Sequence, residues 1–158
     1  MTITALNLPP VYNPRPLVEV DGQRFERIDE LLLAMDMRER EGGLSALELR
    51  LSNIASHLDG SAGYAFEDEN EIRLGSSITV FAGDVSDSRE LFRGLVTGLE
   101  AEFPGSAPPE LLVLAEDGLQ QARMARRTKT YRDMSVADIA REIAQRLGLQ
   151  AEVTGLAS

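Results

Sequence analysis

The sequence predicts a mainly β protein with one C-terminal helix, arranged as a small antiparallel β-barrel flanked by that helix. Three observations support this fold class. Apolar and polar residues alternate over residues 44–54, as in a strand with one buried and one polar face. Asp21-Gly22 stands between two alternating stretches, which is a strong signal for a β-hairpin. Residues 136–147 instead repeat apolar positions with helical spacing.

The first 16 residues contain four prolines, at positions 9, 10, 14 and 16. Proline cannot donate a hydrogen bond to a strand ladder and biases the preceding residue to extended geometry. We therefore predict an extended arm over residues 1–16 and a barrel domain over residues 17–150. The barrel begins with the hairpin of residues 17–25.

A long hairpin is predicted next, from residues 31–40 and 44–54 on either side of Gly42-Gly43. A helix is an alternative over residues 29–40, because Leu, Met, Glu and Arg favour helices. On the hairpin interpretation, one face enters the barrel core and the other is polar. The predicted core residues are Met35, Met37, Leu47, Leu49 and Leu51. The polar residues are Asp36, Arg38, Arg40, Glu48 and Arg50.

A loop is expected over residues 55–71, with a possible helical turn at residues 54–58. Strands are predicted at residues 72–82, 91–103 and 110–115, and the last is the most apolar and therefore central. Glycines alternate with larger residues in the second of these strands. Glycine inside a strand marks a bulge, a sharp bend or a close backbone approach.

The C-terminal helix has local signals that agree with each other. Ser135 can cap its N-terminus with Asp138 three residues on, and Gly148 suits the residue after its last turn. Val136, Ile139, Ala140, Ile143 and Leu147 form one apolar stripe. We expect this stripe to cover one end or face of the barrel. Residues 151–158 are expected to begin a connection to a second domain.

Composition excludes several kinds of chemistry. The chain has 158 residues, a net charge of −10 and no cysteine, so thiolate catalysis, disulfides and cysteine metal sites are excluded. His57 is the single histidine and lies in a polar stretch without a nucleophile-elbow motif. No dinucleotide or phosphate-loop motif and no calcium-loop spacing is present. We therefore predict no catalytic residue, no metal site, no cofactor and no enzymatic activity.

One cluster of charge remains as a candidate site. Residues 123–132 hold five cations and no acid, whereas residues 59–90 hold eight acids and only two arginines. A nucleic-acid surface on a β-barrel normally needs exposed aromatic residues between its cations, and Tyr131 is the only aromatic residue near this cluster. The cluster is therefore predicted to be a protein interface rather than a nucleic-acid site. Its members are Arg123, Arg126, Arg127, Lys129 and Arg132.

The order of these elements resembles the N-terminal region of the phage late control gene D family, which includes hubs of contractile tails and VgrG-type spikes. Two patterns carry the resemblance. Residues 92–97 read Phe-x-Gly-x-Val-Thr, and residues 128–140 read Thr-x-x-Tyr-x-Asp-x-Ser-x-x-x-Ile-Ala. The resemblance extends over about residues 15–150, although the chain matches only the first of that family's two tube-like domains.

The resemblance implies a tail-tube-like barrel and a structural role as a baseplate hub that joins a sixfold tube to a threefold spike. It implies a homo-oligomer, most simply a trimer forming a pseudo-sixfold ring, with a tail tube protein and a spike protein as partners. Such a protein assembles in the bacterial cytoplasm and functions in a virion tail or injection particle. The polar residues Asp36, Arg38, Arg40, Glu48 and Arg50 would then line the lumen of the ring.

A second hypothesis stays open at this point. A small barrel can also be a soluble binding module for a ligand or for single-stranded nucleic acid. The net charge of −10 disfavours nucleic acid as a general partner, because a strongly acidic protein is not attracted to phosphate backbones. No stretch is long and apolar enough to suggest a membrane span.

Overall fold

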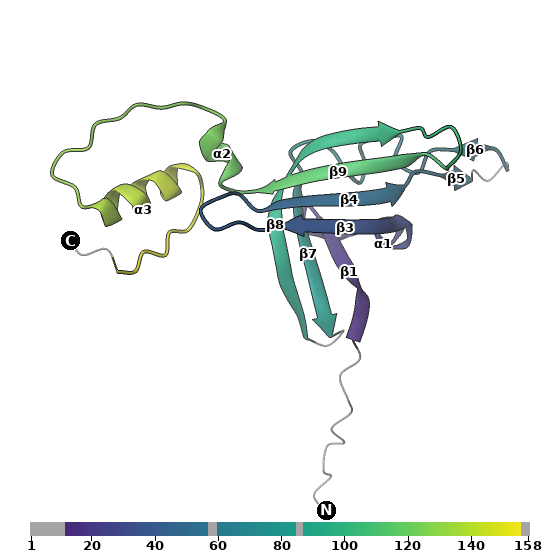
Figure 1. Ribbon diagram of the computed structural model, residues 1–158, viewed down its shortest axis with the longest axis horizontal. Coiled ribbons are helices and arrows are strands. Elements are labelled where there is room, and N and C mark those ends of the chain that lie inside the picture. The colour runs from purple at the N-terminus through teal and green to yellow at the C-terminus, as the bar shows by residue number, and fades with distance from the viewer. Residues whose placement is uncertain (1–11, 57–59, 85–86, 156–158) are drawn as a thin grey trace, which may run out of the picture.

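The computed structural model of the chain describes residues 12–56, 60–84 and 87–155 (Figure 1). His57, which the sequence placed in a loop, lies outside the described residues. The strands are β1 (Tyr12–Val20), β2 (Gln23–Arg24), β3 (Leu32–Arg38), β4 (Ala46–Ser52), β5 (Ala55–Ser56), β6 (Ala62–Gly63), β7 (Ser77–Asp84), β8 (Asp87–Glu102) and β9 (Glu110–Asp117). The helices are α1 (Glu26–Leu31), α2 (Gln120–Arg123) and α3 (Val136–Arg146).

Within the described residues, seven strands form one antiparallel sheet in the order β2-β1-β7-β8-β9-β4-β3, and β5 pairs with β6 separately. The fold is therefore mainly β with a C-terminal helix, as the sequence predicts. Strand β9 pairs with both β4 and β8, so its predicted central place is confirmed. The Asp21-Gly22 hairpin is also confirmed, and both residues adopt positive φ angles, 50° and 73°.

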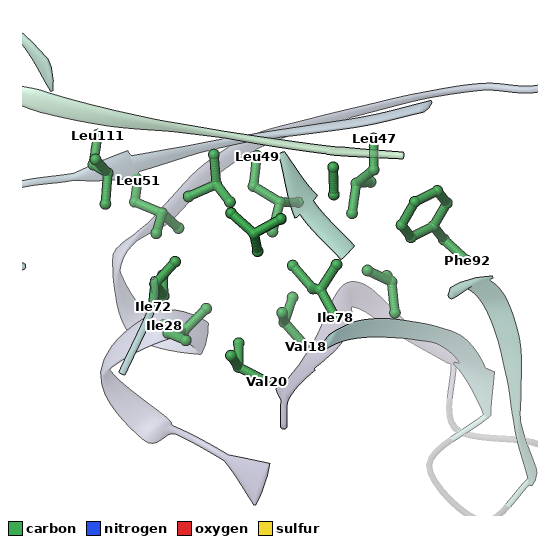
Figure 2. Close-up of a cluster of buried hydrophobic side chains, with 14 residues drawn as sticks. Val18, Val20, Ile28, Leu47, Leu49, Leu51, Ile72, Ile78, Phe92 and Leu111 are labelled. Atoms are coloured by element: carbon green, nitrogen blue, oxygen red, sulfur yellow. The ribbon is translucent and has the colours of Figure 1, made fainter. Parts of the chain in front are cut away.

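The sheet is curled so that its two halves face each other across one apolar core. Figure 2 shows the leucines of β4 pointing toward Val18, Val20 and Ile78 from the opposite half. Leu47, Leu49 and Leu51 are no more than 2% exposed, which confirms the predicted core face of this strand. Full burial of each leucine side chain stabilises the fold by about 1.5–3 kcal/mol.

A closed barrel is not formed, and this part of the predicted fold class is wrong. The edge strands β2 and β3 are not paired with each other among the described residues. Helix α1, which the sequence analysis did not predict, packs against both β1 and β4. Its Ile28 is fully buried in the core. The helix thus closes the apolar core at a position where a barrel would need further strand pairing.

The predicted hairpin of β3 and β4 is confirmed, and the helical alternative for residues 29–40 holds only for the first few positions, in α1. Met35 and Met37 pack against the core as predicted. Leu33, by contrast, is 55% exposed. The register of β3 shifts between Leu32 and Ala34, so Leu32 takes the inward position and Leu33 turns outward.

The glycines of β8 have the two predicted roles. A register shift between Val96 and Gly98 marks a bulge. At Gly94, a Cβ atom would overlap the carbonyl oxygen of Glu116 and come within 2.7 Å of Cζ of Phe92. Glycine is therefore needed at position 94 because β9 and the Phe92 ring approach the backbone closely.

Two other boundaries differ from the expectations. Strand β1 begins at Tyr12 and pairs with β7, so the last residues of the predicted arm belong to the sheet. The segment expected to contain a helical turn near residue 54 instead contributes β5 to a short hairpin with β6. Residues 1–11 lie outside the described part of the chain.

The C-terminal helix forms where the sequence predicts it. The Ser135 side chain accepts a hydrogen bond from the backbone N–H of Asp138 at 3.1 Å, and Gly148 follows with φ of 70°. Its expected place against the barrel is wrong. Among the described residues no strand packs extensively against α3, and Figure 1 shows it standing away from the sheet. Residue 137 is its single buried position.

A carboxylate fastens the β1–β2 turn to the start of β7. Asp21 Oδ1 accepts a hydrogen bond from the backbone N–H of Ser77 at 2.8 Å, and Oδ2 accepts one from the Ser76 hydroxyl at 2.9 Å. These donors, the backbone N–H of Ser77 foremost, lower the pKa of Asp21 below its ordinary value of 3.8. The ionised form of Asp21 is therefore the form that stabilises the fold.

We expect Gly94→Ala to destabilise the protein by about 1–3 kcal/mol, because the added methyl group overlaps the backbone of β9. Urea denaturation followed by circular dichroism measures the change. Gly105→Ala is the matched control, since a Cβ at Gly105 meets no atom within 4 Å. Equal stability of the two variants would show that the close approach at Gly94 is not as described.

We expect Asp21→Asn to lower stability at neutral pH by less than about 1 kcal/mol, because the lost charge–dipole contacts are partly solvent-exposed. Asparagine tolerates the positive φ of this position, so the turn itself is preserved. The folded-state pKa is depressed, so the stabilisation exists above pH 3.8 and disappears as pH falls through the folded-state value. Urea denaturation at several pH values should therefore show the two proteins converging in acid, and a pH-independent difference would argue against this role.

Candidate functional site

The basic cluster forms part of an arm that follows β9. From here on the word arm means residues 119–150 and no longer the extended arm predicted for residues 1–16. It comprises α2, the connecting segment 124–135, and α3. The arm projects from one end of the sheet in Figure 1. It is tied back to the strand end by Leu149, whose Cδ2 atom lies 2.8 Å from where a Cβ of Gly118 would be. Arg123 also reaches Glu116 of β9 at 3.6 Å.

A groove with a volume of about 270 Å³ lies between α2, the connecting segment and α3. One part of its lining is cationic and the other is apolar. The cations are Arg127, Lys129 and Arg146, and Tyr131 adds an aromatic ring. Its remaining lining residues are Gln121, Ala122, Ala125, Ile143 and Leu147.

Glu142 is the centre of the ionic contacts that hold this groove together. Its Oε1 atom accepts hydrogen bonds from Nζ of Lys129 and from the Arg146 guanidinium, the latter at 2.6 Å. The Lys129 ammonium, followed by Arg146, lowers the pKa of the Glu142 carboxyl. Lys129 also lies 4.9 Å from the centroid of the Tyr131 ring, in a cation–π contact. The connecting segment is thereby fastened to α3.

The structure brings only part of the predicted cluster together. Arg127 and Lys129 line the groove, whereas Arg123 turns toward Glu116. Arg126 and Arg132 are exposed outside the groove lining. Arg126, Arg127 and Arg132 form no ion pair with any residue in the described ranges. That the five cations contact a partner stays a prediction.

Sequence reasoning missed Arg146 and the apolar wall of the groove. Arg146 is not among the predicted site residues, but it stands four residues after Glu142, at the spacing that lets the two side chains meet. Ile143 and Leu147 were assigned to a stripe facing the sheet. They line the groove, because the connecting segment folds back over α3.

The apolar stripe of α3 is only partly covered. Ile139, Ala140 and Leu147 are half-buried, but Val136 is 63% exposed and Ile143 is 42% exposed, and Met124 in the connecting segment is 74% exposed. An isolated helix of this length is only marginally stable in water, and most helical stability in proteins comes from packing of the apolar face. The arm therefore presents exposed apolar residues beside the cations of the connecting segment.

The residues predicted to line a lumen lie on the outer face of the sheet. Arg50 bonds to Glu102 and Glu110 at 2.9 Å each, and Arg38 pairs with Asp36 at 2.8 Å. Glu48 lies 4.0 Å from Arg50, while Arg40 follows the end of β3. The face is thus a network of paired, partly exposed charges, which contribute little stability each.

No group of three acidic or histidine side chains that could hold a metal ion occurs in the described ranges. The acid run at residues 67–71 is exposed except for Glu71, which lies 3.5 Å from Arg27. In the same part of the chain, no helix is long and apolar enough to cross a membrane.

The sequence profile of the Alg8 N-terminal domain matches residues 54–157 of the chain. The match includes β5 to β9 and the whole described part of the arm. No curated protein matches the sequence.

This match overturns four expectations from the sequence. The resemblance to the late control gene D family is wrong, and so is the function as a baseplate hub or, alternatively, as a barrel-type binding module. The predicted location, with assembly in the bacterial cytoplasm and function in a virion tail or injection particle, is also wrong. The tube and spike partners rested on that resemblance alone. The prediction of no enzymatic activity is also contradicted, because the matched family is a glycosyltransferase family. The chain belongs to the Alg8 N-terminal domain family.

Proposed function

We propose that this chain is the N-terminal domain of a glycosyltransferase and supports sugar transfer through the protein contacts of its arm. The family match over residues 54–157 is the observation that carries this proposal. It includes the arm as well as the strands of the sheet, so the arm belongs to the domain and is not a variable tail.

The geometry of the arm favours contact with a polypeptide. Its exposed apolar residues lie on a helix, and the cations around them are exposed or held only at the surface. Exposed apolar patches rimmed by polar residues mark protein interaction sites, and arginine and aromatic residues are enriched in such interfaces. The sheet supplies a rigid base, since its core is fully buried from β1 to β9.

The experiment deletes the gene region for residues 54–157 from the source cells and measures glycosyl transfer from radiolabelled sugar nucleotides in cell extracts. We expect transfer to fall by about tenfold or more, because the deletion removes β7, β8 and β9 together with the arm and so abolishes every contact that the domain makes. Restoring the wild-type chain should restore transfer. Unchanged transfer after the deletion would contradict the proposed function.

The role of the arm is tested by restoring the chain as Ile143→Asp instead of wild type. A buried charge at the contact should weaken docking, so sugar transfer should stay low although the sheet folds. Leu91→Asp is the matched control, because Leu91 is 43% exposed and Ile143 is 42% exposed. If both variants restored transfer equally, the arm would not be the contact surface.

A further inference from the structure

The molecule has a second exposed apolar site, at the end of the sheet opposite the arm. Phe103 follows β8 and Tyr64 follows β6, and they are 64% and 46% exposed. Their rings meet edge to face with centroids 5.7 Å apart. Figure 1 shows the β5–β6 hairpin at one end of the molecule and α3 at the other. We call Tyr64 and Phe103 the aromatic end.

Acidic residues lie beside Phe103 at the aromatic end. Glu102 precedes Phe103 and is paired across the sheet with Glu110, and Arg50 is bonded to both. Glu100 is exposed on the same strand. The charge beside Phe103 is therefore negative, since three carboxylates outnumber the single arginine that is bonded to two of them.

The two ends complement each other in shape and in charge. The arm offers a partly apolar groove in which Arg127 forms no ion pair with any described residue, whereas the aromatic end offers two rings beside the carboxylates of Glu100, Glu102 and Glu110. The groove volume of about 270 Å³ exceeds the volume of one phenylalanine side chain. An aromatic ring seated in a pocket between charged pairs is the usual anchor of a protein interface.

We propose that the arm of one copy of this chain binds the aromatic end of a second copy, head to tail. Phe103 would enter the groove beside Ile143, and Arg127 would face the carboxylates around the aromatic end. The contact deepens the proposed function by naming the partner of the arm. It rests on that function only in treating the arm as a protein contact surface.

Charge explains why the occupant is a second copy in this orientation. The chain carries a net charge of −10, so two copies repel each other unless a cationic surface meets an acidic one. Because the two surfaces lie at opposite ends, one contact leaves a free arm and a free aromatic end. Such a head-to-tail contact produces a ring if it closes and a filament if it does not.

Sedimentation velocity of the purified chain over a range of concentrations tests the association itself. The average mass should rise above that of a monomer as concentration increases. A monomer at every concentration would overturn the proposal. It would leave the proposed function intact, because sugar transfer in cell extracts is measured separately.

Substitutions at each surface locate the contact. Phe103→Ser and Ile143→Ser should each weaken association by about tenfold or more. Matched controls with the same exposure, Leu74→Ser at 63% and Leu91→Ser at 43%, should associate like the wild type. Arg127→Glu changes the groove without altering a helical residue, so its loss of association separates a contact effect from unfolding of α3. If Phe103→Ser, Ile143→Ser and Arg127→Glu all associated as strongly as the wild type, the proposal would be overturned.

Mixing the two defective variants tests the orientation. Phe103→Ser keeps an intact arm and Ile143→Ser keeps an intact aromatic end, so an equal mixture should form one-to-one dimers that grow no further. Each variant alone should stay monomeric at the lowest concentration at which the wild type associates. A mixture that remains monomeric, or that grows like the wild type, would overturn the head-to-tail contact.

Discussion

The packing of the β4 leucines against the side chains of β1 and β7 is the contact on which the rest of the structure depends. Leu47, Leu49 and Leu51 alternate with polar residues, so their burial fixes which face of the hairpin looks outward. That choice curls the sheet around one core, with β9 as an interior strand between β4 and β8. Helix α1 completes the core through Ile28. The sheet thereby becomes a rigid base whose two ends carry the exposed surfaces.

The arm depends on ionic contacts more than on this core. Glu142 bridges Lys129 of the connecting segment and Arg146 of α3, and Leu149 packs back beside Gly118. Those contacts shape a groove but leave Val136 and Ile143 of α3 exposed. A domain built in this way can present α3 to another polypeptide without disturbing its own sheet. The same reasoning identifies the aromatic end as the complementary surface.

Local sequence patterns predicted the elements whose formation is determined by neighbouring residues in the chain. The alternation in β4 and the Ser135 cap of α3 identified both elements, because strand faces and helix ends are determined within a few residues. Helix α1 was missed, since Glu26–Leu31 is short and buries only Ile28. The predicted position of α3 was also wrong, because an apolar stripe indicates that a helix packs against another surface but does not identify that surface. The groove was only half predicted, since Ile143 and Arg146 reach it through the path of the connecting segment.

The mistaken family resemblance has a physical explanation in the same residues. In β8, Phe92 and Val96 are buried, and Gly94 is required by the close approach of Glu116. An antiparallel strand beside a crowded neighbour needs this pattern whatever its family. The pattern at residues 128–140 ends in a capped helix start, which is equally general. Both patterns describe local packing, and neither carries information about ancestry or assembly.

Helix α3 stands apart from the core of the sheet and is available to a partner. Amide hydrogen exchange of the dilute chain probes this arrangement, because protection reports the local free energy of opening. Strong protection is expected in β4 and β9, where residues are buried on the core face and paired on both sides. Much faster exchange is expected throughout α3. Protection of α3 equal to that of β4 and β9 would show that α3 is packed against the rest of the chain.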